Sequence, residues 1–324
     1  MSRLVALVVL LSLVLVTPAS AMAQEASPAA SPLAGPCVAP ELPPGTPTPM
    51  DEAMPAAAME ATPGSGEDEG VAVEEEAPAG TPADPTAASE AEAALENLFN
   101  CINTGDYLAA AALMTDTFIH NYIEVSTPYD VPATFAGVQP VDVRSVSNAQ
   151  TYADGRVSVD VVFTGLFNGP GALGSERFFF AEEDGTSKLD YLEAVALPEG
   201  ALPGATVIDV QMVDFAFALS EYTVPANTPV IFRTTNNSGT GSPHVNVVLT
   251  YEEGTTAEGL IEGEDDIEEA STGFYGAVFL EPGQSGDLAF ESLAPGTYFL
   301  VCDVETADGT PHYELGMVSQ VTVE

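Results

Sequence analysis

The sequence predicts two folded units of different class: an α+β unit over residues 87–197, with helices packed on a curved antiparallel sheet, and an all-β Greek-key sandwich over residues 205–324. In the first unit, apolar residues recur every three or four positions and then alternate, which indicates helices followed by antiparallel strands. In the second, short strand patterns alternate with Pro- and Gly-rich turns, as is typical of a β-sandwich. A short Pro-, Gly- and Glu-containing linker, residues 198–204, joins them.

The first 23 residues predict an export signal. Arg3 supplies a positive charge, an apolar run follows over residues 4–16, and Ala21-Met22-Ala23 offers a small-x-small cleavage site. The run is too short to span a bilayer, although an uncleaved anchor is the alternative reading. We therefore expect an exported, extracytoplasmic protein without a membrane span after cleavage, in a compartment where disulfides persist.

The balance of charge limits the partners. The chain has 49 Asp and Glu residues but only six Lys and Arg, for a formal charge of −43. Such a chain cannot neutralise phosphates, which excludes nucleic acid, and it would be repelled by an anionic membrane surface. The acidity favours either a merely well-solvated surface or a partner that is basic or cationic.

Residues 24–86 predict a disordered tether. They are rich in Pro, Ala, Gly and Glu and contain no aromatic residue. Such a segment buries too little apolar surface to offset the entropy of ordering the chain. Cys37 is the one residue within it that could tie it down locally.

The α+β unit is expected to open with a helix over residues 89–101, then a turn at residues 103–106 and a second helix over residues 107–114. Three strands follow, at residues 155–163, 177–180 and 189–192. This order resembles the cone-shaped fold of nuclear transport factor 2 and the polyketide-cyclase-like proteins. That fold serves enzymes and empty scaffolds alike, so the resemblance does not decide the function of this unit. The alternatives are binding of a small apolar ligand or a partner, and an isomerase or cyclase activity, for which a placed acid–base pair is lacking. The unit holds a lone histidine, His120, without a matching acid–base pair, so we predict no catalytic residues.

The sandwich is predicted to consist of seven strands, at residues 206–213, 228–235, 244–250, 277–280, 287–291, 296–302 and 317–323. Each boundary carries Pro, Gly or Asn, residues that favour turns. In the sixth strand, Tyr298, Leu300 and Cys302 alternate onto one face, so Cys302 points inward if the tyrosine does.

Four residues of the sandwich form a metal-ligand pattern: His244, Cys302, His312 and Met317. Nine residues separate Cys302 from His312, and four separate His312 from Met317. A blue-copper site uses two imidazoles, one thiolate and a weak axial thioether. Here one strand ends at the cysteine and the next begins at the methionine, so a single loop can carry three ligands while His244 comes from a distant strand.

The flanking motifs resemble those of plastocyanin-like cupredoxins. Asn-Asn-Ser-Gly at 236–239 with Ser-Pro-His at 242–244 is similar to their first-histidine loop, and Ala-Pro-Gly-Thr-Tyr at 294–298 is similar to the run before their cysteine. The resemblance implies one type 1 copper ion held by His244, Cys302, His312 and Met317, and outer-sphere electron transfer. The sequence departs from plastocyanin in a longer loop before His312 and in an insert at residues 251–275.

The same residues also allow other functions. The sandwich could have kept the fold and lost the metal, which would leave a non-redox binding or scaffold module of the cell envelope. Zinc would accept His, His and Cys, but the methionine suits copper better. With three histidines in the whole chain, a multicopper oxidase or nitrite reductase site cannot be built, so we predict that the protein is not an enzyme.

Two further expectations concern the remaining features. If a metal holds Cys302, Cys37 is left to pair with Cys101, within one chain or between chains. The insert at residues 251–275 contains nine acids and no base: Glu252, Glu253, Glu258, Glu262, Glu264, Asp265, Asp266, Glu268 and Glu269. We expect it to start at the end of the sandwich opposite the copper and to be either a solvated, mobile loop or a docking patch for a basic redox partner.

Overall fold

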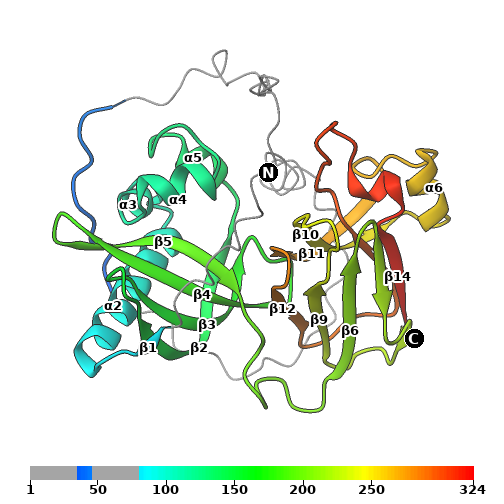
Figure 1. The fold of residues 1–324 in the computed structure, drawn as a ribbon, viewed down its shortest axis with the longest axis horizontal. Helices are drawn as coiled ribbons and strands as arrows, with labels where there is room; N and C mark the ends of the chain where they lie inside the picture. The colour runs from blue at the N-terminus through cyan, green and yellow to red at the C-terminus, as the bar shows by residue number, and fades with distance from the viewer. Residues whose placement is uncertain (1–34, 46–79) are drawn as a thin grey trace, which may run out of the picture.

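The computed structural model describes residues 35–45 and 80–324 (Figure 1). The expected signal peptide, residues 1–23, and most of the expected tether lie outside the described residues. The described chain forms an α+β unit, on the left of Figure 1, and a β-sandwich, on the right.

The α+β unit packs its helices on one face of its strands. In chain order its elements are β1 (Thr81–Pro82), α2 (Pro85–Asn103), α3 (Tyr107–Ala112), α4 (Asp116–Asn121), α5 (Val131–Thr134), β2 (Gln139–Thr151), β3 (Val157–Leu166), β4 (Ala172–Glu183) and β5 (Thr186–Ala194). The ring of Phe99 on α2 contacts Phe163 on β3 and Phe178 on β4, with centroids 6.0 and 5.5 Å apart. These three side chains belong to one buried apolar cluster that joins helices and strands.

Order begins earlier than the sequence patterns suggest. We expected a disordered tether up to residue 86, but β1 pairs with β2 and α2 begins at Pro85. The physical reason is local: the Asp84 side chain accepts hydrogen bonds from the backbone amides of Thr86 and Ala87, and Pro85 occupies the first helical turn, where its missing N–H costs nothing. Residues 35–45 are also described, and Cys37 forms the expected disulfide with Cys101 at the end of α2.

The sandwich contains every strand that the turn signals predict, together with two short strands and two short helical segments that they do not. Its elements are β6 (Thr206–Val213), β7 (Ala216–Leu219), β8 (Thr223–Val224), β9 (Val230–Asn236), β10 (His244–Tyr251), α6 (Ala257–Glu262), β11 (Ser271–Leu280), β12 (Ser285–Phe290), β13 (Gly296–Val301), η3 (His312–Leu315) and β14 (Val318–Val323).

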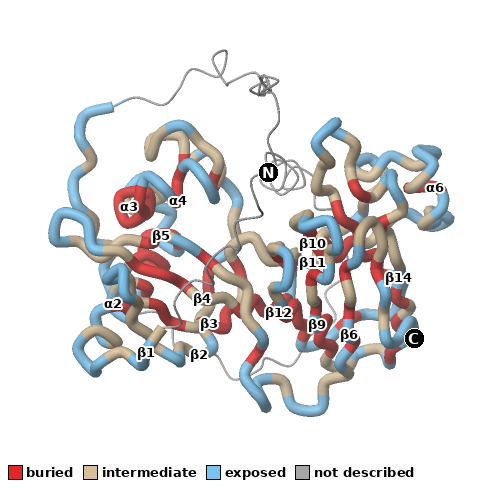
Figure 2. The backbone as a smooth tube through the Cα atoms, in the orientation of Figure 1, coloured by how far each residue is buried: buried red, intermediate tan, exposed pale blue. Residues whose placement is uncertain are grey.

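Two sheets form the sandwich. One is five-stranded, in the order β11-β10-β13-β14-β8, and it faces the β12-β9-β6-β7 part of the other. Buried side chains from both sheets fill the space between them. The backbone of the buried residues is red in Figure 2. All five residues from Tyr298 to Cys302 are buried, so both faces of β13 are covered. The sulfur of Cys302 points toward His244 and His312.

The second sheet runs from one unit into the other. Its nine strands include both β4 of the α+β unit and β12 of the sandwich, which pair antiparallel through Leu288 and Gly174. The linker is anchored at the same seam: the backbone amide of Leu197 donates to Oδ2 of the buried Asp287, which also accepts from Arg233. The two sequence-predicted units are therefore joined by backbone hydrogen bonds as well as by the linker.

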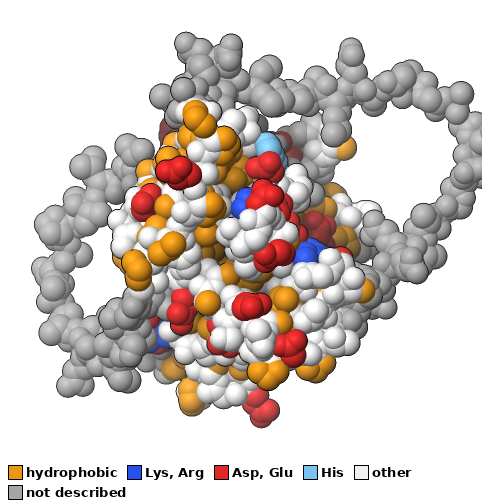
Figure 3. All heavy atoms as spheres, turned by 90° about the vertical axis from the view of Figure 1, so that its left-hand side faces the viewer, with side chains coloured by type: hydrophobic (Ala, Val, Ile, Leu, Met, Phe, Trp, Pro, Cys, Tyr) orange, Lys and Arg blue, Asp and Glu red, His pale blue; other side chains and the backbone are white. Residues whose placement is uncertain are grey.

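The acidic insert is only partly a loop. It leaves the end of β10 opposite His244, as expected, but its helix α6 packs against η3 and β14. Leu260 of α6 is buried in the sandwich core, and the helix is capped by Thr256 at its start and Gly263 at its end. Acidic side chains are also spread over the α+β face shown in Figure 3, with few basic ones among them.

Candidate metal centre

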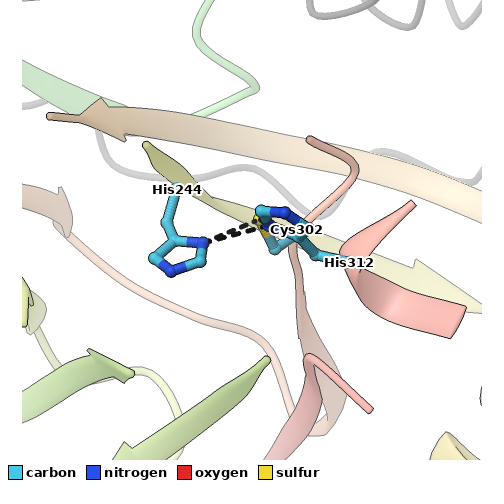
Figure 4. Close-up of side chains that lie close together, drawn as sticks. All are labelled: His244, Cys302 and His312. Atoms are coloured by element: carbon cyan, nitrogen blue, oxygen red, sulfur yellow. Dashed lines mark hydrogen bonds between the residues drawn. The ribbon is translucent and has the colours of Figure 1, made fainter. Parts of the chain in front are cut away.

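The structure brings three of the four predicted ligand side chains together. Nδ1 of His244 lies 3.1 Å from Nδ1 of His312, and Sγ of Cys302 lies 3.8 and 3.4 Å from those two nitrogens (Figure 4). All three residues are buried, with relative exposures of 0–1%. Among the described residues, this is the one group of three or more His, Cys, Asp or Glu side chains close enough to hold a common ion.

Strand register explains why His244 and Cys302 meet. β10 runs antiparallel to β13, with Val247 opposite Val301, so the start of β10 and the residue that follows β13 lie at the same end of the sheet. The backbone amide of Val245 points at the sulfur of Cys302, at 3.4 Å. His244 and Cys302, which are 58 positions apart in the chain, are thereby held close together by the pairing of β10 with β13.

The loop after Cys302 returns His312 to the same point. It folds as a small hairpin in which the amide of Thr306 donates to the carbonyl of Thr310, and Gly309 supplies the left-handed turn residue at φ 84°. This agrees with the turn expected at Asp308-Gly309. The amide of His312 then donates to the carbonyl of Val304 at 2.8 Å, which sets where η3 begins.

The backbone of Met317 is hydrogen-bonded to two of the other predicted ligand residues. Its amide donates to the carbonyl of His312, and its carbonyl accepts from the amide of Cys302. The side chain is fully buried in the same apolar cluster as Cys302. All four residues singled out from the sequence thus lie at one end of the sandwich.

Burial keeps the ligands neutral when no metal is bound. It raises the pKa of the Cys302 thiol to about 12. Burial, and then the neighbouring His244, lower the pKa of His312 to about 4, and burial also lowers the pKa of His244. At neutral pH both imidazoles therefore offer lone pairs, while the thiol must lose its proton when a metal binds.

The donor set fits a single metal ion. Atoms separated by 3.1 to 3.8 Å can all be reached from one central point at about 2.0–2.3 Å, the usual length of metal–nitrogen and metal–sulfur bonds in proteins. Two imidazoles and a thiolate, with a methionine alongside, match the preference of copper for soft and borderline donors.

The turn between β6 and β7 also borders the site, and the sequence patterns gave no sign of it. Oδ1 of Asp214 lies 3.7 Å from Nε2 of His244, and the ring of Phe215 lies 4.8 Å from that of His312. An Asp-Phe pair at a strand end has no motif of its own. Only the three-dimensional pairing of β6 with β9, which precedes the His244 loop, brings it to the centre.

His120, by contrast, is remote from this centre. Its two ring nitrogens lie 2.7 and 2.9 Å from the carbonyls of Asp116 and Ser126 in the α+β unit, so the ring serves local structure. No helix among the described residues is long and apolar enough to cross a membrane.

Comparisons with known proteins give structural neighbours only. No protein-family model matches the sequence, and a search of curated proteins finds no relative. Similar solved structures include reduced auracyanin from Roseiflexus castenholzii, at 26% identity and a TM-score of 0.28, covering 37% of this chain and 99% of that one. Auracyanin A, a blue copper protein from Chloroflexus aurantiacus, is similar at 20% identity and a TM-score of 0.28, covering 37% of this chain and all of that one.

Reduced rusticyanin is similar at 16% identity and a TM-score of 0.26, covering 40% of this chain and 84% of that one. These three neighbours are cupredoxins. The resemblance of residues 87–197 to the nuclear-transport-factor-2-like and polyketide-cyclase-like proteins is not supported by the comparisons and stays a prediction.

Proposed function

We propose that this protein binds one copper ion through His244, Cys302, His312 and Met317 and carries single electrons outside the cytoplasm. The observation that carries the proposal is the convergence of two imidazole nitrogens and one thiol sulfur within 3.8 Å of one another in a buried site. Copper bound there would supply a one-electron couple between Cu(II) and Cu(I).

The protein side chains suit a carrier better than an enzyme. The three donors are held by strand pairing and by backbone hydrogen bonds of the ligand loop, so their positions can persist through a change of charge. Their burial leaves the centre closed to a substrate. A second group of ligand side chains is absent from the described residues, which supports electron transfer in place of turnover.

The partner we propose is a basic or cationic redox protein. Helix α6 of the acidic insert packs against η3, the turn that begins with His312. Exposed acids on that insert therefore lie near the ligand loop, where they would steer a cationic partner toward the metal.

The competing proposal is a metal-free scaffold whose α+β unit binds a small ligand. Metal analysis separates the two. We expect protein dialysed with equimolar Cu(II) and Zn(II) to retain one copper per chain, and His312→Ala to lose most of it. His120→Ala, which removes a histidine remote from the centre, should keep it. Retention of zinc alone, or equal copper in His312→Ala and the parent, would exclude the proposed centre.

A further inference from the structure

The β6–β7 turn touches both imidazoles of the centre. It consists of two residues, Asp214 and Phe215, between the paired residues Val213 and Ala216. Asp214 approaches His244, with 3.7 Å between Oδ1 and Nε2. Phe215 packs edge to face on His312, with ring centroids 4.8 Å apart and planes at 65°.

The carboxylate of Asp214 is fixed by the loop that precedes His244. Oδ1 accepts hydrogen bonds from the hydroxyls of Ser238 and Thr240, at 2.6 and 2.9 Å. Oδ2 accepts from the backbone amides of Gly239 and Thr240, at 2.9 and 3.1 Å. These hydrogen bonds lower the pKa of Asp214 below its ordinary value, and the bond from Ser238 has the largest effect. The group is therefore a rigidly held anion aimed at the first histidine.

The facing nitrogen of His244 is unsatisfied. Nε2 is buried and has no hydrogen-bond partner, since 3.7 Å is too long for a hydrogen bond. The other nitrogen, Nδ1, points to Cys302 and His312, where a metal would take its lone pair. The ring proton then belongs on Nε2, and a shift of well under 1 Å would bring it within bonding range of Asp214.

Phe215 adopts a backbone conformation that bulky residues avoid. Its φ is +59°, in the left-handed region. Unfavourable backbone conformations persist where the surrounding structure requires them. Here the conformation places the ring over His312, whose relative exposure is 1%.

We propose that Asp214 and Phe215 are positioning residues of the metal centre: Asp214 accepts a hydrogen bond from Nε2–H of His244, and Phe215 covers the ring of His312. The inference rests on the proposed function and adds to it. Ligating histidines are commonly oriented by a carboxylate on their second nitrogen, and loss of such a partner typically lowers metal affinity about 10- to 100-fold.

Asp214→Asn tests the proposed hydrogen bond between Asp214 and His244 in two ways. In metal-free protein at pH 7, histidine nitrogen NMR should show His244 of the parent as the Nε2–H tautomer and should show mixed tautomers in the variant. In the copper protein, affinity for Cu(II) should fall about tenfold or more while that for Cu(I) changes less. The reduction potential would then rise, by about 59 mV for each tenfold difference.

Two control variants isolate the carboxylate. Asp209→Asn removes the same charge from an exposed position of β6 and should change neither tautomer nor potential. Ser238→Ala removes one bond to Asp214 but keeps the carboxylate, and should preserve the tautomer. An Asp214→Asn protein with parental tautomer and potential would overturn the inference, as would Ser238→Ala reproducing the full effect. If the parent binds no copper, the proposed function fails, while the metal-free spectra still decide the Asp214–His244 contact.

The second part of the proposal is that Phe215 shields His312, and with it the metal, from solvent. Stopped-flow removal of Cu(II) by EDTA should be severalfold faster in Phe215→Ala than in the parent, while Phe215→Leu, which keeps apolar bulk, should stay close to the parent. Phe215→Gly separates the ring from the backbone, because glycine accepts φ of +59° without strain. It should lose copper as fast as the alanine variant even though its turn is relaxed. Parental rates in both the alanine and glycine variants would contradict the shielding role.

Discussion

Nδ1 of His244 lies 3.1 Å from Nδ1 of His312, although the two residues are 68 positions apart in the chain. Both rings are buried and both pKa values are lowered, so both imidazoles are uncharged at neutral pH, each with a single ring proton. The two nitrogens and the Cys302 sulfur lie within hydrogen-bonding distance of one another in a buried site, and all three could instead bind one metal ion. This relationship is the foundation of the copper proposal.

The role of Met317 predicts a change in potential without loss of colour. Met317→Leu keeps the apolar volume but removes the thioether, and the axial ligand tunes the potential of blue-copper centres. We expect the reduction potential to rise while the visible band of the Cu(II) form remains. Met114→Leu, a buried methionine of the α+β unit, is the matched control and should match the parent. Identical potentials in all three proteins would show that Met317 does not act on the metal.

The acidic insert predicts salt-dependent electron transfer. Glu258, Glu262, Glu264 and Glu268 are exposed, whereas Asp266 holds a turn by accepting from the amides of Glu268 and Glu269. Changing those four glutamates to Gln should slow reduction of a cationic acceptor at low salt. It should also flatten the salt dependence, because the screening length is about 8 Å at 0.15 M.

The same number of charges can be removed far from the centre as a control. Glu90, Glu92, Glu96 and Glu182 are exposed on the α+β unit. Their replacement by Gln should leave the rate nearly unchanged at each ionic strength. If both quadruple variants give the same curves, the insert has no specific docking role.

Glu176 predicts a pH-dependent stability in the α+β unit. Its Oε2 is buried without a hydrogen-bond partner, and burial raises its pKa from 4.5 to about 7. A raised pKa means that the folded state holds the proton more tightly than the unfolded state. The contribution of the protonated carboxyl to the free energy of unfolding is therefore complete below pH 4.5 and is lost as pH rises through about 7. Glu176→Gln should match the parent at pH 4 and exceed it by up to about 3 kcal/mol at pH 8.

Denaturant unfolding at the two pH values measures this difference. Glu182→Gln, at an exposed position of the same strand, should give the same difference from the parent at pH 4 and pH 8. If the unfolding free energies of Glu176→Gln and the parent differ by the same amount at pH 4 and pH 8, the Glu176 carboxyl ionises in the folded protein at little cost in stability.

The disulfide between Cys37 and Cys101 predicts a stability contribution that is independent of copper. It closes a loop with a sequence separation of 64 residues, which corresponds to about 4 kcal/mol in the chain-entropy account. The double change Cys37→Ser and Cys101→Ser should lower the unfolding free energy by that order and leave copper binding intact. Non-reduced, metal-free protein should show one free thiol after denaturation, that of Cys302. Three free thiols would exclude the bridge.

The sandwich could be predicted largely from sequence because each strand is bounded by turn residues. β6 has the predicted bounds, and the ligand positions followed from the spacing of His244, Cys302, His312 and Met317. β2 was missed because it lies near the sheet edge, where most of its residues are partly exposed and the apolar alternation is weak. α4, with six residues, is too short to show a helical period.

Long-range pairing was beyond reach of the sequence patterns. The antiparallel contact of β4 with β12, which joins the two units into one sheet, links Gly174 with Leu288. Local sequence propensities do not specify which distant strands pair with each other. The same holds for Asp214 and Phe215, whose place at the metal centre depends on the pairing of β6 with β9.

The most direct test of the account is the visible absorption spectrum of the purified, metal-free protein titrated with Cu(II). A thiolate bound to Cu(II) gives an intense charge-transfer band, so we predict that blue colour grows to saturation at one copper per chain. Cys302→Ser should bind no copper in this way and stay colourless while its far-ultraviolet circular dichroism matches the parent. A parent protein that stays colourless at saturating Cu(II), or a Cys302→Ser variant with the same band, would contradict the proposed centre.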